Sequence, residues 1–594
     1  MTNQEVAKLL RNVAAAYSIK DEKKYRFQII AYQKAASSIE TLTKQLKDLY
    51  KEDDLNNIPG VGESIKNHLL ELFKTGEVSH FRTVMGQVSQ AVFPLLDIPS
   101  FGPKKAYKLT EHFNLTNPKT VIADIKKLAQ SGQIAELDTF GEKSQKDILQ
   151  ALDEYSKGAG KTTRMVLPVA NNIAQEVIKY LKKSKDVKQA YALGSLRRMK
   201  STVGDVDLAV SSSNPQGAIE HFMNYPYKSR MIEKGTITAS FLTSGKQQVD
   251  LMVLPPKQLG SLLQHFTGSK NHNVALREHA IKKGYSLSEK GIKLKNGSLK
   301  TFSSEEDFYN FLGMDWIAPE MRENKGEIEL AIKRNLPKLV SLSDIKGDLH
   351  THSNYPIEPS HDLGINSMQE MVDKALDLKY EYIGFSEHNP SVSMHTEKQI
   401  FSILSKRKAH IEQLNKSLKN QKTNNKNVRV INLLEVDILA SGKIALPESC
   451  FDLVDAFLVS IHSSFGMEKK AMTERIIKGM SSPKAKILSH PTARMINNRP
   501  GINPDWGEIF EFVAKANKAL EINSWPERLD LPDDLVFEAK AKNVKFIINT
   551  DSHAASQMDN MFYGVSVARR GWLTKNEVLN TKNDADFSSW INSK

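Results

Sequence analysis

Two aspartates that stand one residue apart are the first side chains with recognisable chemistry. Asp205 and Asp207 lie in GDVDLAV, and Asp250 lies in a similar apolar run, QQVDLMVL. Side chains at i and i+2 of a strand share a face, so the first two carboxylates would repel each other unless a cation joined them. Three such carboxylates can hold two divalent ions for phosphoryl transfer. An ordinary acidic pair at an exposed strand end is the alternative.

A glycine–serine turn precedes the acidic pair and is followed by two arginines. Gly194, Ser195, Arg197 and Arg198 could together face the oxygens of a triphosphate. Joined to the three aspartates, this turn favours a phosphoryl-transfer site over a structural role. The glycine-rich stretch at 158–163, GAGKTT, lacks the spacing of a phosphate loop, and we interpret it as a linker.

Histidines dominate a second group. Nine of the sixteen fall in residues 341–594, and several end apolar runs. Imidazoles and carboxylates at the C-terminal ends of successive strands converge at the mouth of a barrel. A lone histidine near a strand end is usually an ordinary polar residue, but a whole series predicts a centre for Mn²⁺, Zn²⁺ or Fe²⁺. The series is His350, His352, His388, Glu435, His462, His490, Asp551 and His553.

The first part of the chain that must position these groups reads as helical. Apolar residues recur at helical spacing over 1–80. Three segments, 56–72, 97–109 and 137–149, each place a turn of small residues before a helix. Such a turn can bring backbone N–H groups close to a phosphate, and a simple corner between helices is the alternative.

Mixed α/β patterning begins near residue 164. A helix is predicted at about 170–183, followed by strands at AYALGS, DVDLAV and QVDLMVL. Residues 260–316 read as mainly helical or irregular, and 317–345 as a polar helical connector. From Ile345 onward, short apolar runs alternate with helical stretches, which predicts a barrel-like α/β domain.

Length and charge agree with several domains and a polyanionic partner. The 594 residues predict about four structural units. Residues 1–340 hold 50 Lys and Arg against 37 Asp and Glu, whereas residues 341–594 hold 32 of each, so the net charge of +13 lies in the first part. Cys450 is the only cysteine, which excludes intramolecular disulfides and favours the cytoplasm. We expect neither a membrane span nor a signal peptide.

The acidic motif resembles the nucleotidyltransferase palm of family X DNA polymerases. G-S-x-R-R, G-D-V-D and a later V-D carry the likeness, together with FTGSKNHNVALR from Phe266. The likeness implies triphosphate contacts at Gly194, Ser195 and Arg198, sugar contacts at Phe266 and Gly268, a base contact at Asn273 and a template contact at Arg277. Two departures are His265, where the family usually has an aromatic residue, and Gln248, where it often has a basic one.

The small-residue turns resemble helix-hairpin-helix motifs, and residues 1–80 resemble the domain that binds the 5′-phosphate of a DNA gap. The likeness implies DNA contacts at Gly60, Gly62, Gly102 and Gly141, and at Tyr32 and Lys34. His68 replaces the lysine that forms a Schiff base in lyase-competent relatives. An imidazole cannot form that imine, so lyase activity by that route is not expected.

The histidine series resembles the PHP (polymerase and histidinol phosphatase) domain over 345–575. That likeness adds Asp362 to the eight residues above and implies a centre of up to three ions, with His361 as a competitor for the place of Asp362. It also suggests phosphate contacts at Arg494, Arg499 and Arg528, and His395 is expected at the surface. Metal-assisted hydrolysis of a phosphodiester is the natural reaction.

These observations predict a multidomain α/β protein with a helix-hairpin-helix N-terminal region, a polymerase beta-like palm and a C-terminal PHP distorted (β/α)7 barrel. The expected function is gap filling in base excision repair with a 3′–5′ exonuclease or abasic-site endonuclease. Two Mg²⁺ in the palm, Mn²⁺ or Zn²⁺ in the barrel, DNA and deoxynucleoside triphosphates are implied, and the chain is expected to be a cytoplasmic monomer. The expected domains are 1–82, 83–160, 161–258, 259–316, the linker 317–344, and 345–580.

Two other functions are compatible with parts of the sequence. A template-independent nucleotidyltransferase with a small-molecule phosphoesterase domain would use the same ligand sets, but would not need the DNA-binding turns. A DNA-binding scaffold with inactive metal sites would not need the intact carboxylates and histidines.

Overall fold

The computed structural model describes residues 1, 3–40, 46–51, 55, 58, 61–98, 101–156, 164–420 and 428–593. Gly60 and the glycine-rich stretch 158–163 therefore lie outside the described residues. The chain divides into two compact units. The first is Met1–Ala192, Val203–Pro255 and Asn497–Arg499, and the second is Leu193–Thr202, Pro256–Ile496 and Pro500–Lys594. None of the helices described combines the length and apolar character that crossing a bilayer requires.

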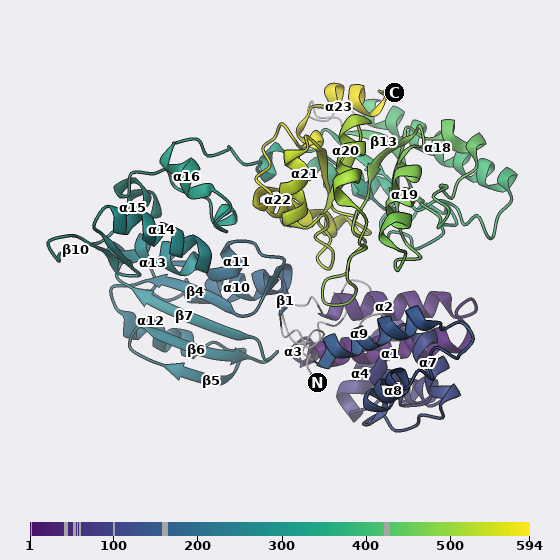
Figure 1. The fold of residues 1–594 in the computed structure, drawn as a ribbon, viewed down its shortest axis with the longest axis horizontal. Helices are drawn as coiled ribbons and strands as arrows, with labels where there is room; N and C mark the ends of the chain where they lie inside the picture. The colour runs from purple at the N-terminus through teal and green to yellow at the C-terminus, as the bar shows by residue number, and fades with distance from the viewer. Residues whose placement is uncertain are drawn as a thin grey trace. The chain divides into compact units, whose positions relative to one another are not determined.

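The N-terminal part of the first unit is helical, as predicted (Figure 1). Helix α4 shows why: Ile65, Leu69 and Leu72 lie on one buried face, and Gly76 ends the helix in the left-handed conformation. Two apolar cores follow one another along the chain, one within residues 6–81 and one mainly within 88–152. The helices are α1 (Asn3–Asp21), α2 (Arg26–Glu40), α3 (Leu46–Lys51), α4 (Glu63–Thr75), α5 (Ser79–Met85), α6 (Val92–Leu95), α7 (Pro103–His112), α8 (Val121–Gln130) and α9 (Glu142–Ser156).

A five-stranded mixed sheet of order β2-β4-β7-β6-β5 completes the first unit. Strands β4 and β7 pair in parallel and bring Asp207 and Asp250 into register, while the other pairs are antiparallel. The predicted strands thus form, together with two that were not predicted, β5 and β6. The elements are β1 (Met165–Val166), α10 (Leu167–Leu181), β2 (Gln189–Ala192), β3 (Thr202–Val203), β4 (Val206–Ser211), α12 (Pro215–Met223), β5 (Lys228–Lys234), β6 (Thr238–Thr243) and β7 (Gln248–Leu254).

The second unit begins with short helices and a small antiparallel sheet of order β10-β9-β8. The segment 260–316 is mainly helical or irregular, as predicted, apart from this sheet, whose two- and three-residue strands are too short to give a sequence signal. The elements are α11 (Gly194–Arg197), η2 (Pro256–Gln258), α13 (Leu259–Thr267), α14 (Lys270–Lys282), β8 (Ser286–Ser288), β9 (Gly291–Lys293), β10 (Leu299–Lys300), α15 (Glu305–Phe311), η3 (Pro319–Met321) and α16 (Glu327–Ile332).

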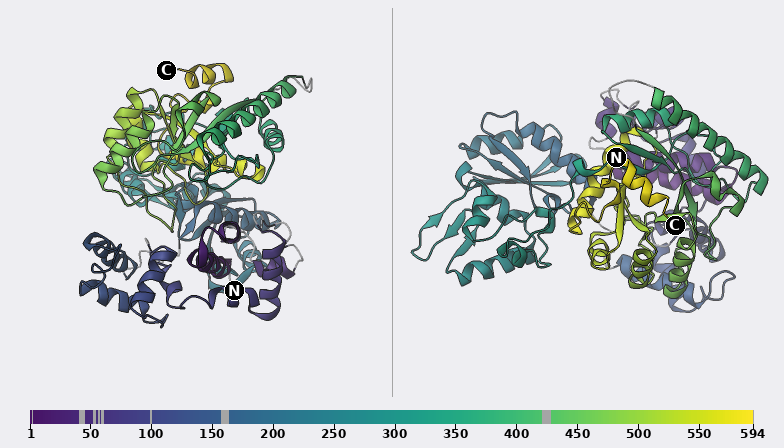
Figure 2. Two further views of the ribbon diagram at one scale, coloured as in Figure 1. Left: turned by 90° about the vertical axis from the view of Figure 1, so that its right-hand side faces the viewer. Right: turned by 90° about the horizontal axis from the view of Figure 1, so that it is seen from above.

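The predicted barrel is confirmed as a seven-stranded sheet in which successive strands pair in parallel. A bridge between Thr351 and Ser552 brings its first and last strands together. Every strand is almost wholly buried because helices cover the outside, among them the long α18 beside β13 (Figure 2). The strands are β11 (Gly347–Thr351), β12 (Tyr382–Phe385), β13 (Arg429–Asp437), β14 (Ala456–Ser460), β15 (Ala485–Leu488), β16 (Ala519–Asn523) and β17 (Lys545–Asn549).

Helical segments connect these strands and close the C-terminal end. They are η4 (Leu342–Asp344), α17 (Met368–Asp377), α18 (Glu397–Asn420), η5 (Glu448–Leu453), α19 (Lys469–Met480), α20 (Trp506–Lys515), α21 (Asp533–Ala541), η6 (Ala555–Asn560), α22 (Met561–Arg570), η7 (Leu579–Thr581) and α23 (Asp584–Ile591).

Candidate metal and nucleic-acid sites

The structure brings the three palm aspartates together. Asp205 precedes β4, Asp207 lies on it, and Asp250 is the register partner of Asp207 on β7. One carboxylate oxygen from each lies within 4.8 Å of the other two. Asp205 is exposed and the other two are half-buried, so the set lies at the edge of the sheet, where substrate and ions can reach it.

Gln248 controls how Asp250 faces this group. Its amide nitrogen lies 3.0 Å from each carboxylate oxygen of Asp250 and donates to both. Since i and i+2 on β7 share a face, the sequence position of Gln248 already places it beside the aspartate. Because the side-chain amide of Gln248 is neutral, it orients the carboxylate of Asp250 without placing a positive charge beside it.

The two arginines after the glycine–serine turn are already paired. Arg197 contacts Glu305 at 2.6 Å, and Arg198 contacts Glu323 at 3.1 Å and donates to the carbonyl of Thr267. Burial opposes the charge of Arg198 and lowers its pKa, while Glu323 favours the charge. A triphosphate would therefore have to replace Glu323 to reach Arg198.

The predicted nucleotide-binding segment forms the end of α13 and the start of α14. Phe266 is half-buried, and Gly268 takes a positive φ of 68°. The side-chain amide of Asn273 donates to the carbonyl of His265 at 2.7 Å. Arg277 is exposed. Asn273 thus stabilises this turn, and Arg277 faces solvent.

Three predicted DNA-binding glycines each stand directly before a helix. Gly62 precedes α4, Gly102 precedes α7, and Gly141 precedes α9. Among the described residues, no atom would lie within 4 Å of a Cβ added at any of the three. This part of the structure thus leaves room for a DNA phosphate at each helix N-terminus.

Stacked rings surround His68, which by the family resemblance occupies the position of the Schiff-base lysine. Tyr32 is buried, and its hydroxyl lies 3.1 Å from Nδ1 of His68. The ring of His68 stacks on that of His80 at 4.7 Å. Burial, assisted by His80, lowers the pKa of His68. Lys34 is half-buried on the same helix as Tyr32, while Lys66 pairs with Glu63 at 3.8 Å.

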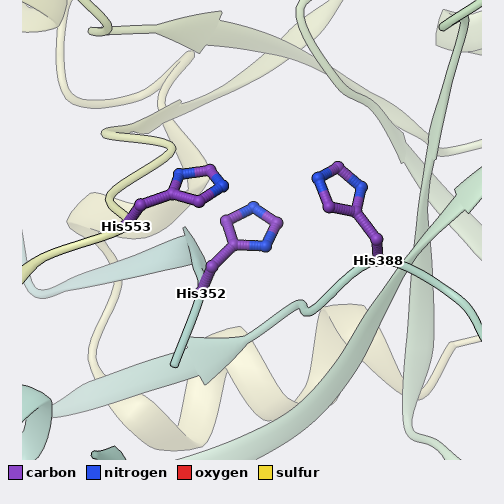
Figure 3. Close-up of side chains that lie close together, drawn as sticks. All are labelled: His352, His388 and His553. Carbon is purple, nitrogen blue, oxygen red and sulfur yellow. The ribbon is translucent and has the colours of Figure 1, made fainter. Parts of the chain in front are cut away.

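All nine predicted barrel ligands come together at one end of the strands. His350 lies near the end of β11 and Glu435 near the end of β13, while the others follow strands or lie in the loop after β11. Figure 3 shows the imidazole of His352 between those of His388 and His553. The ring centroids of His352 and His553 are 4.1 Å apart, and those of His352 and His388 are 4.7 Å apart.

Glu435 stands in the middle of this cluster. Its Oε2 lies 2.9 Å from Nδ1 of His388 and 3.3 Å from Nε2 of His350. Its Oε1 lies 2.9 Å from Nε2 of His490 and 3.4 Å from Nε2 of His462. One carboxylate thus faces four imidazoles and would hold cations together with them.

Two aspartates complete the cluster from the neighbouring loops after β17 and β11. Oδ1 of Asp551 lies 3.3 Å from Nε2 of His352. The carboxylate of Asp362 lies 3.5 Å from Nε2 of His388 and 3.5 Å from Nε2 of His553. Asp362, placed by resemblance alone, therefore has the geometry of a ligand.

The buried polar atoms of the cluster fit a metal centre. Several of them make no hydrogen bond within the described structure although other polar atoms approach closely: Nε2 of His350, both ring nitrogens of His352, Nδ1 of His388, Oε2 of Glu435, Nδ1 of His490 and Nε2 of His553. Buried polar groups without hydrogen bonds are costly. Cations shared among these lone pairs would satisfy them.

Electrostatics favours the cation-binding form of Glu435 and His352 but not of every ligand. Burial is outweighed at His350 by Glu521 and at His388 by Glu435, and the pKa of each of these two imidazoles is raised. Burial opposes charge on Glu435, yet His388 and His350 hold the pKa of this carboxylate well below its ordinary value. Burial and the neighbouring His553 hold the pKa of His352 well below that of a free imidazole. Ionised carboxylates and neutral imidazoles are the states that coordinate metals.

Two residues beside the metal cluster, Glu521 and Asp437, were not predicted from the sequence. His361 was predicted only as a competitor for the place of Asp362. Oε1 of Glu521, buried in β16, lies 2.7 Å from Nδ1 of His350. Asp437, at the end of β13, lies 2.6 Å from Nδ1 of His462 and 3.1 Å from Nε2 of His361. A lone carboxylate inside an apolar strand was the available signal for Glu521, and the E-x-D spacing after Glu435 was the signal for Asp437.

The predicted phosphate-binding arginines differ in their surroundings. Arg494 donates to the carbonyls of Arg528 and Leu529, so it supports a loop. Nε of Arg528 lies 3.7 Å from Oδ2 of Asp551, beside the metal cluster. Arg499 falls in the other compact unit. His395, predicted to lie at the surface rather than to be a ligand, pairs with the exposed carboxylate of Glu358 at 2.7 Å.

Family models match two segments of the chain. A helix-hairpin-helix domain model matches residues 1–78, and a DNA polymerase beta thumb model matches residues 262–323. The first covers α1, α2 and α4, and the second covers the segment from α13 to η3.

Curated relatives match the chain over its whole length or about half of it. A Bacillus subtilis protein named DNA polymerase/3′-5′ exonuclease PolX is 29% identical over 594 residues, which is 100% of this chain and 99% of the relative. DNA polymerase lambda of Rattus norvegicus is 25% identical over 54% of this chain and 56% of its own length. DNA polymerase lambda of Arabidopsis thaliana is 23% identical over 54% of this chain and 62% of its own. A full-length match of this kind, a polymerase thumb and a histidine-lined parallel barrel place the chain in the family X DNA polymerases that carry a C-terminal PHP domain.

Proposed function

We propose that this chain is a DNA-directed DNA polymerase that fills short gaps in base excision repair, and that its barrel is a metal-dependent 3′–5′ exonuclease. The observation that carries the proposal is the presence of two separate ligand sets, one of carboxylates and one rich in imidazoles. The full-length relative is named for both activities. DNA and deoxynucleoside triphosphates are the substrates, and divalent ions are required.

In the palm, Asp205, Asp207 and Asp250 would hold two Mg²⁺. Paired ions of this kind stabilise the attacking and leaving oxygens of phosphoryl transfer. Gln248 orients Asp250 through its two hydrogen bonds. Hard oxygen ligands favour Mg²⁺ at this site.

The nucleotide would be received by residues of the second compact unit. Gly194, Ser195 and Arg198 would bind its triphosphate, once Glu323 has released the arginine. The remaining contacts follow the family resemblance: Phe266 and Gly268 against the sugar, Asn273 at the base edge and Arg277 at the template.

DNA would be held through its backbone, without regard to sequence. The helix N-termini after Gly60, Gly62, Gly102 and Gly141 would contact phosphates. Tyr32 and Lys34 would lie beside the 5′-phosphate of the gap. No Schiff base can form at His68, so the polymerase would depend on another enzyme to remove a deoxyribose phosphate.

In the barrel, the nine-residue cluster would hold up to three ions. Nitrogen donors favour Mn²⁺ or Zn²⁺, which supply a nucleophile at neutral pH and stabilise negative charge on the phosphate. Glu435 orders the surrounding imidazoles, and Arg528 would bind the substrate phosphate. Cleavage beside an abasic site is the same reaction on another phosphodiester. We further propose that the protein acts as a monomer in the cytoplasm, a compartment that its single cysteine suits.

Reciprocal variants of the full-length protein test both assignments. Asp205→Ala should abolish primer extension on gapped DNA and leave Mn²⁺-stimulated degradation of a 3′ end intact. His350→Ala combined with Asp551→Ala should do the reverse. Extension that survives the first change would reject the palm assignment, and degradation that survives the second would reject the barrel assignment. Equal extension of gapped and single-stranded DNA would favour a template-independent transferase.

A further inference from the structure

One tryptophan has surroundings unlike those of the other four. Trp316 and Trp572 belong to the core of the thumb region, Trp590 belongs to the barrel core, and Trp506 stacks on Phe510 within α20. Trp525 is half-buried in the loop between β16 and α21, and belongs to none of the apolar cores described. Its indole is therefore not part of those cores.

Trp525 lies beside the barrel metal cluster. Its ring centroid is 6.4 Å from that of His553, with the two planes at 68°. Ile365, in the neighbouring loop after β11, donates its N–H to the carbonyl of His553 at 2.7 Å, and its side chain is 53% exposed. An aromatic ring and an exposed aliphatic side chain are thus both carried by backbone that adjoins His553.

The loop that carries Trp525 is held firmly. The carbonyl of Trp525 accepts hydrogen bonds from the N–H groups of Arg528 and Leu529 at 2.8 and 3.0 Å, and a bridge between Asn523 and Asp530 closes the base of the loop. The side chain of Asn523 accepts from the N–H of Trp525 at 2.9 Å. The indole is therefore presented at a fixed place.

Arg528, on the same loop, has a guanidinium nitrogen available to bind an anion. Its Nη1 is buried and has no hydrogen-bond partner within the described structure. Its Nε lies 3.7 Å from Asp551 of the metal cluster. A phosphate between Arg528 and the metal ions would satisfy this donor and lie within a few ångströms of the indole.

We propose that Trp525, Ile365 and Arg528 form a subsite for the 3′-terminal nucleotide of a DNA strand, with the terminal base stacked on Trp525 and its phosphate bound by Arg528. The inference rests on the proposed nuclease function of the barrel and specifies its substrate. Aromatic stacking accepts every base because each presents a π-face. Degradation would thus require a terminal base without depending on which base it is.

Cleavage of two oligothymidylates tests the stacking. One ends in an ordinary thymidine and the other in an abasic tetrahydrofuran residue. The wild-type enzyme should favour the first in kcat/KM by about tenfold, from the usual strength of a stacked base. Trp525→Ala should remove that preference, Trp525→Phe should keep most of it, and Arg528→Gln should slow both substrates. An equal loss on both substrates in Trp525→Ala, or no loss, would overturn the proposal.

Tryptophan fluorescence provides a readout that does not need turnover. An oligothymidylate with a 3′-terminal phosphorothioate linkage should quench the wild-type protein and Trp506→Phe equally, and should quench Trp525→Phe less. Quenching that is unchanged in Trp525→Phe would reject the subsite. If the wild type cleaves neither substrate with any divalent ion, the nuclease function fails, and the fluorescence result still decides whether the nucleotide binds here.

Discussion

At the level of single residues, Asp437 determines how two histidines face the barrel cluster. Its carboxylate lies 2.6 Å from Nδ1 of His462 and 3.1 Å from Nε2 of His361. Carboxylates that orient a metal-binding imidazole typically raise metal affinity 10–100-fold. We therefore expect Asp437→Asn to weaken Mn²⁺ binding by about tenfold or more, as measured by metal titration of the full-length protein.

A capping aspartate provides the matched control for this change. Asp344 accepts hydrogen bonds from Ser341 at the start of the barrel and lies outside the metal cluster. Asp344→Asn should leave metal affinity unchanged. Equal affinity in Asp437→Asn and the wild type would exclude the orienting role.

A comparable prediction for the palm concerns Gln248. Removing its two hydrogen bonds to Asp250 by Gln248→Ala should lower polymerase kcat/KM by about tenfold or more, because a hydrogen bond to a charged group contributes about 1.5–3 kcal/mol. Steady-state incorporation on gapped DNA measures the effect. Gln247→Ala, one residue away on the chain, is the control, and 3′-end degradation should not change in either variant. A rate at the wild-type level would mean that Asp250 is held by the strand alone.

Sequence patterns identified site residues only where side chains that can bind metals stood beside a recognisable apolar run. Asp205 and Asp207 stood out because they stand one residue apart at the start of an apolar run, and the strand-end histidines because they follow apolar runs. Glu521 and Asp437 lie inside strands and act through His350 and through His361 and His462 respectively, so their roles depend on tertiary contacts. Chain order alone does not encode those contacts.

At the level of elements, a substitution at the N-terminus of α4 can distinguish a role in DNA binding from a role in stability. Gly62 has φ −78° and ψ 170°, which alanine can adopt, and an added Cβ would touch no atom of the described residues. Because Gly62 is the N-cap, where glycine is preferred to alanine, Gly62→Ala should lower the free energy of unfolding only modestly, by about 0.5–1 kcal/mol. It should nevertheless weaken binding to gapped DNA by several-fold, because the methyl group would stand where a phosphate approaches.

Gly76, at the other end of the same helix, is the contrasting control. Its φ of 85° is unfavourable for alanine, so Gly76→Ala should cost about 1 kcal/mol of stability and leave DNA affinity largely intact. Thermal unfolding and fluorescence anisotropy with gapped DNA measure the two effects. Unchanged DNA affinity in Gly62→Ala would remove this turn from the interface.

Elements were predictable to the extent that they bury a regular apolar face. Barrel strands are apolar on both faces and flanked by helices, so their runs are plain in the sequence. Strand β5 instead reads KSRMIEK and is almost wholly exposed, so it has no alternation to recognise. It forms because β6 offers an antiparallel partner. The domain boundaries at 82, 160, 258, 316 and 344 remain predictions.

At the level of the whole molecule, Arg570 joins the barrel to the segments that precede it within the second compact unit. Its buried guanidinium donates to the carbonyl of Arg198 at 2.6 Å, to Asp533 at 2.7 Å and to Glu323 at 3.1 Å. Arg570→Ala would leave two carboxylates partly buried without their main partner. Loss of one member of a buried ion pair costs about 3–5 kcal/mol, so we expect a marked fall in Tm.

A nearby exposed pair provides the comparison. Lys325 contacts Asp534 at 2.6 Å, but the aspartate side chain is 70% exposed. Lys325→Ala should cost less than about 1 kcal/mol, because solvent screens such a pair. Differential scanning calorimetry of both variants distinguishes the two cases, and equal melting temperatures would show that the Arg570 network does not stabilise the fold.

The position of Trp572 has a consequence for how this protein could be divided or recombined. The residue follows α22 of the barrel, yet its side chain is buried in the core formed by α14, α15 and α16. A cut in the connector would expose apolar surface on both fragments at once. Exchange of barrels between related chains would therefore require the matching thumb surface to be exchanged with them.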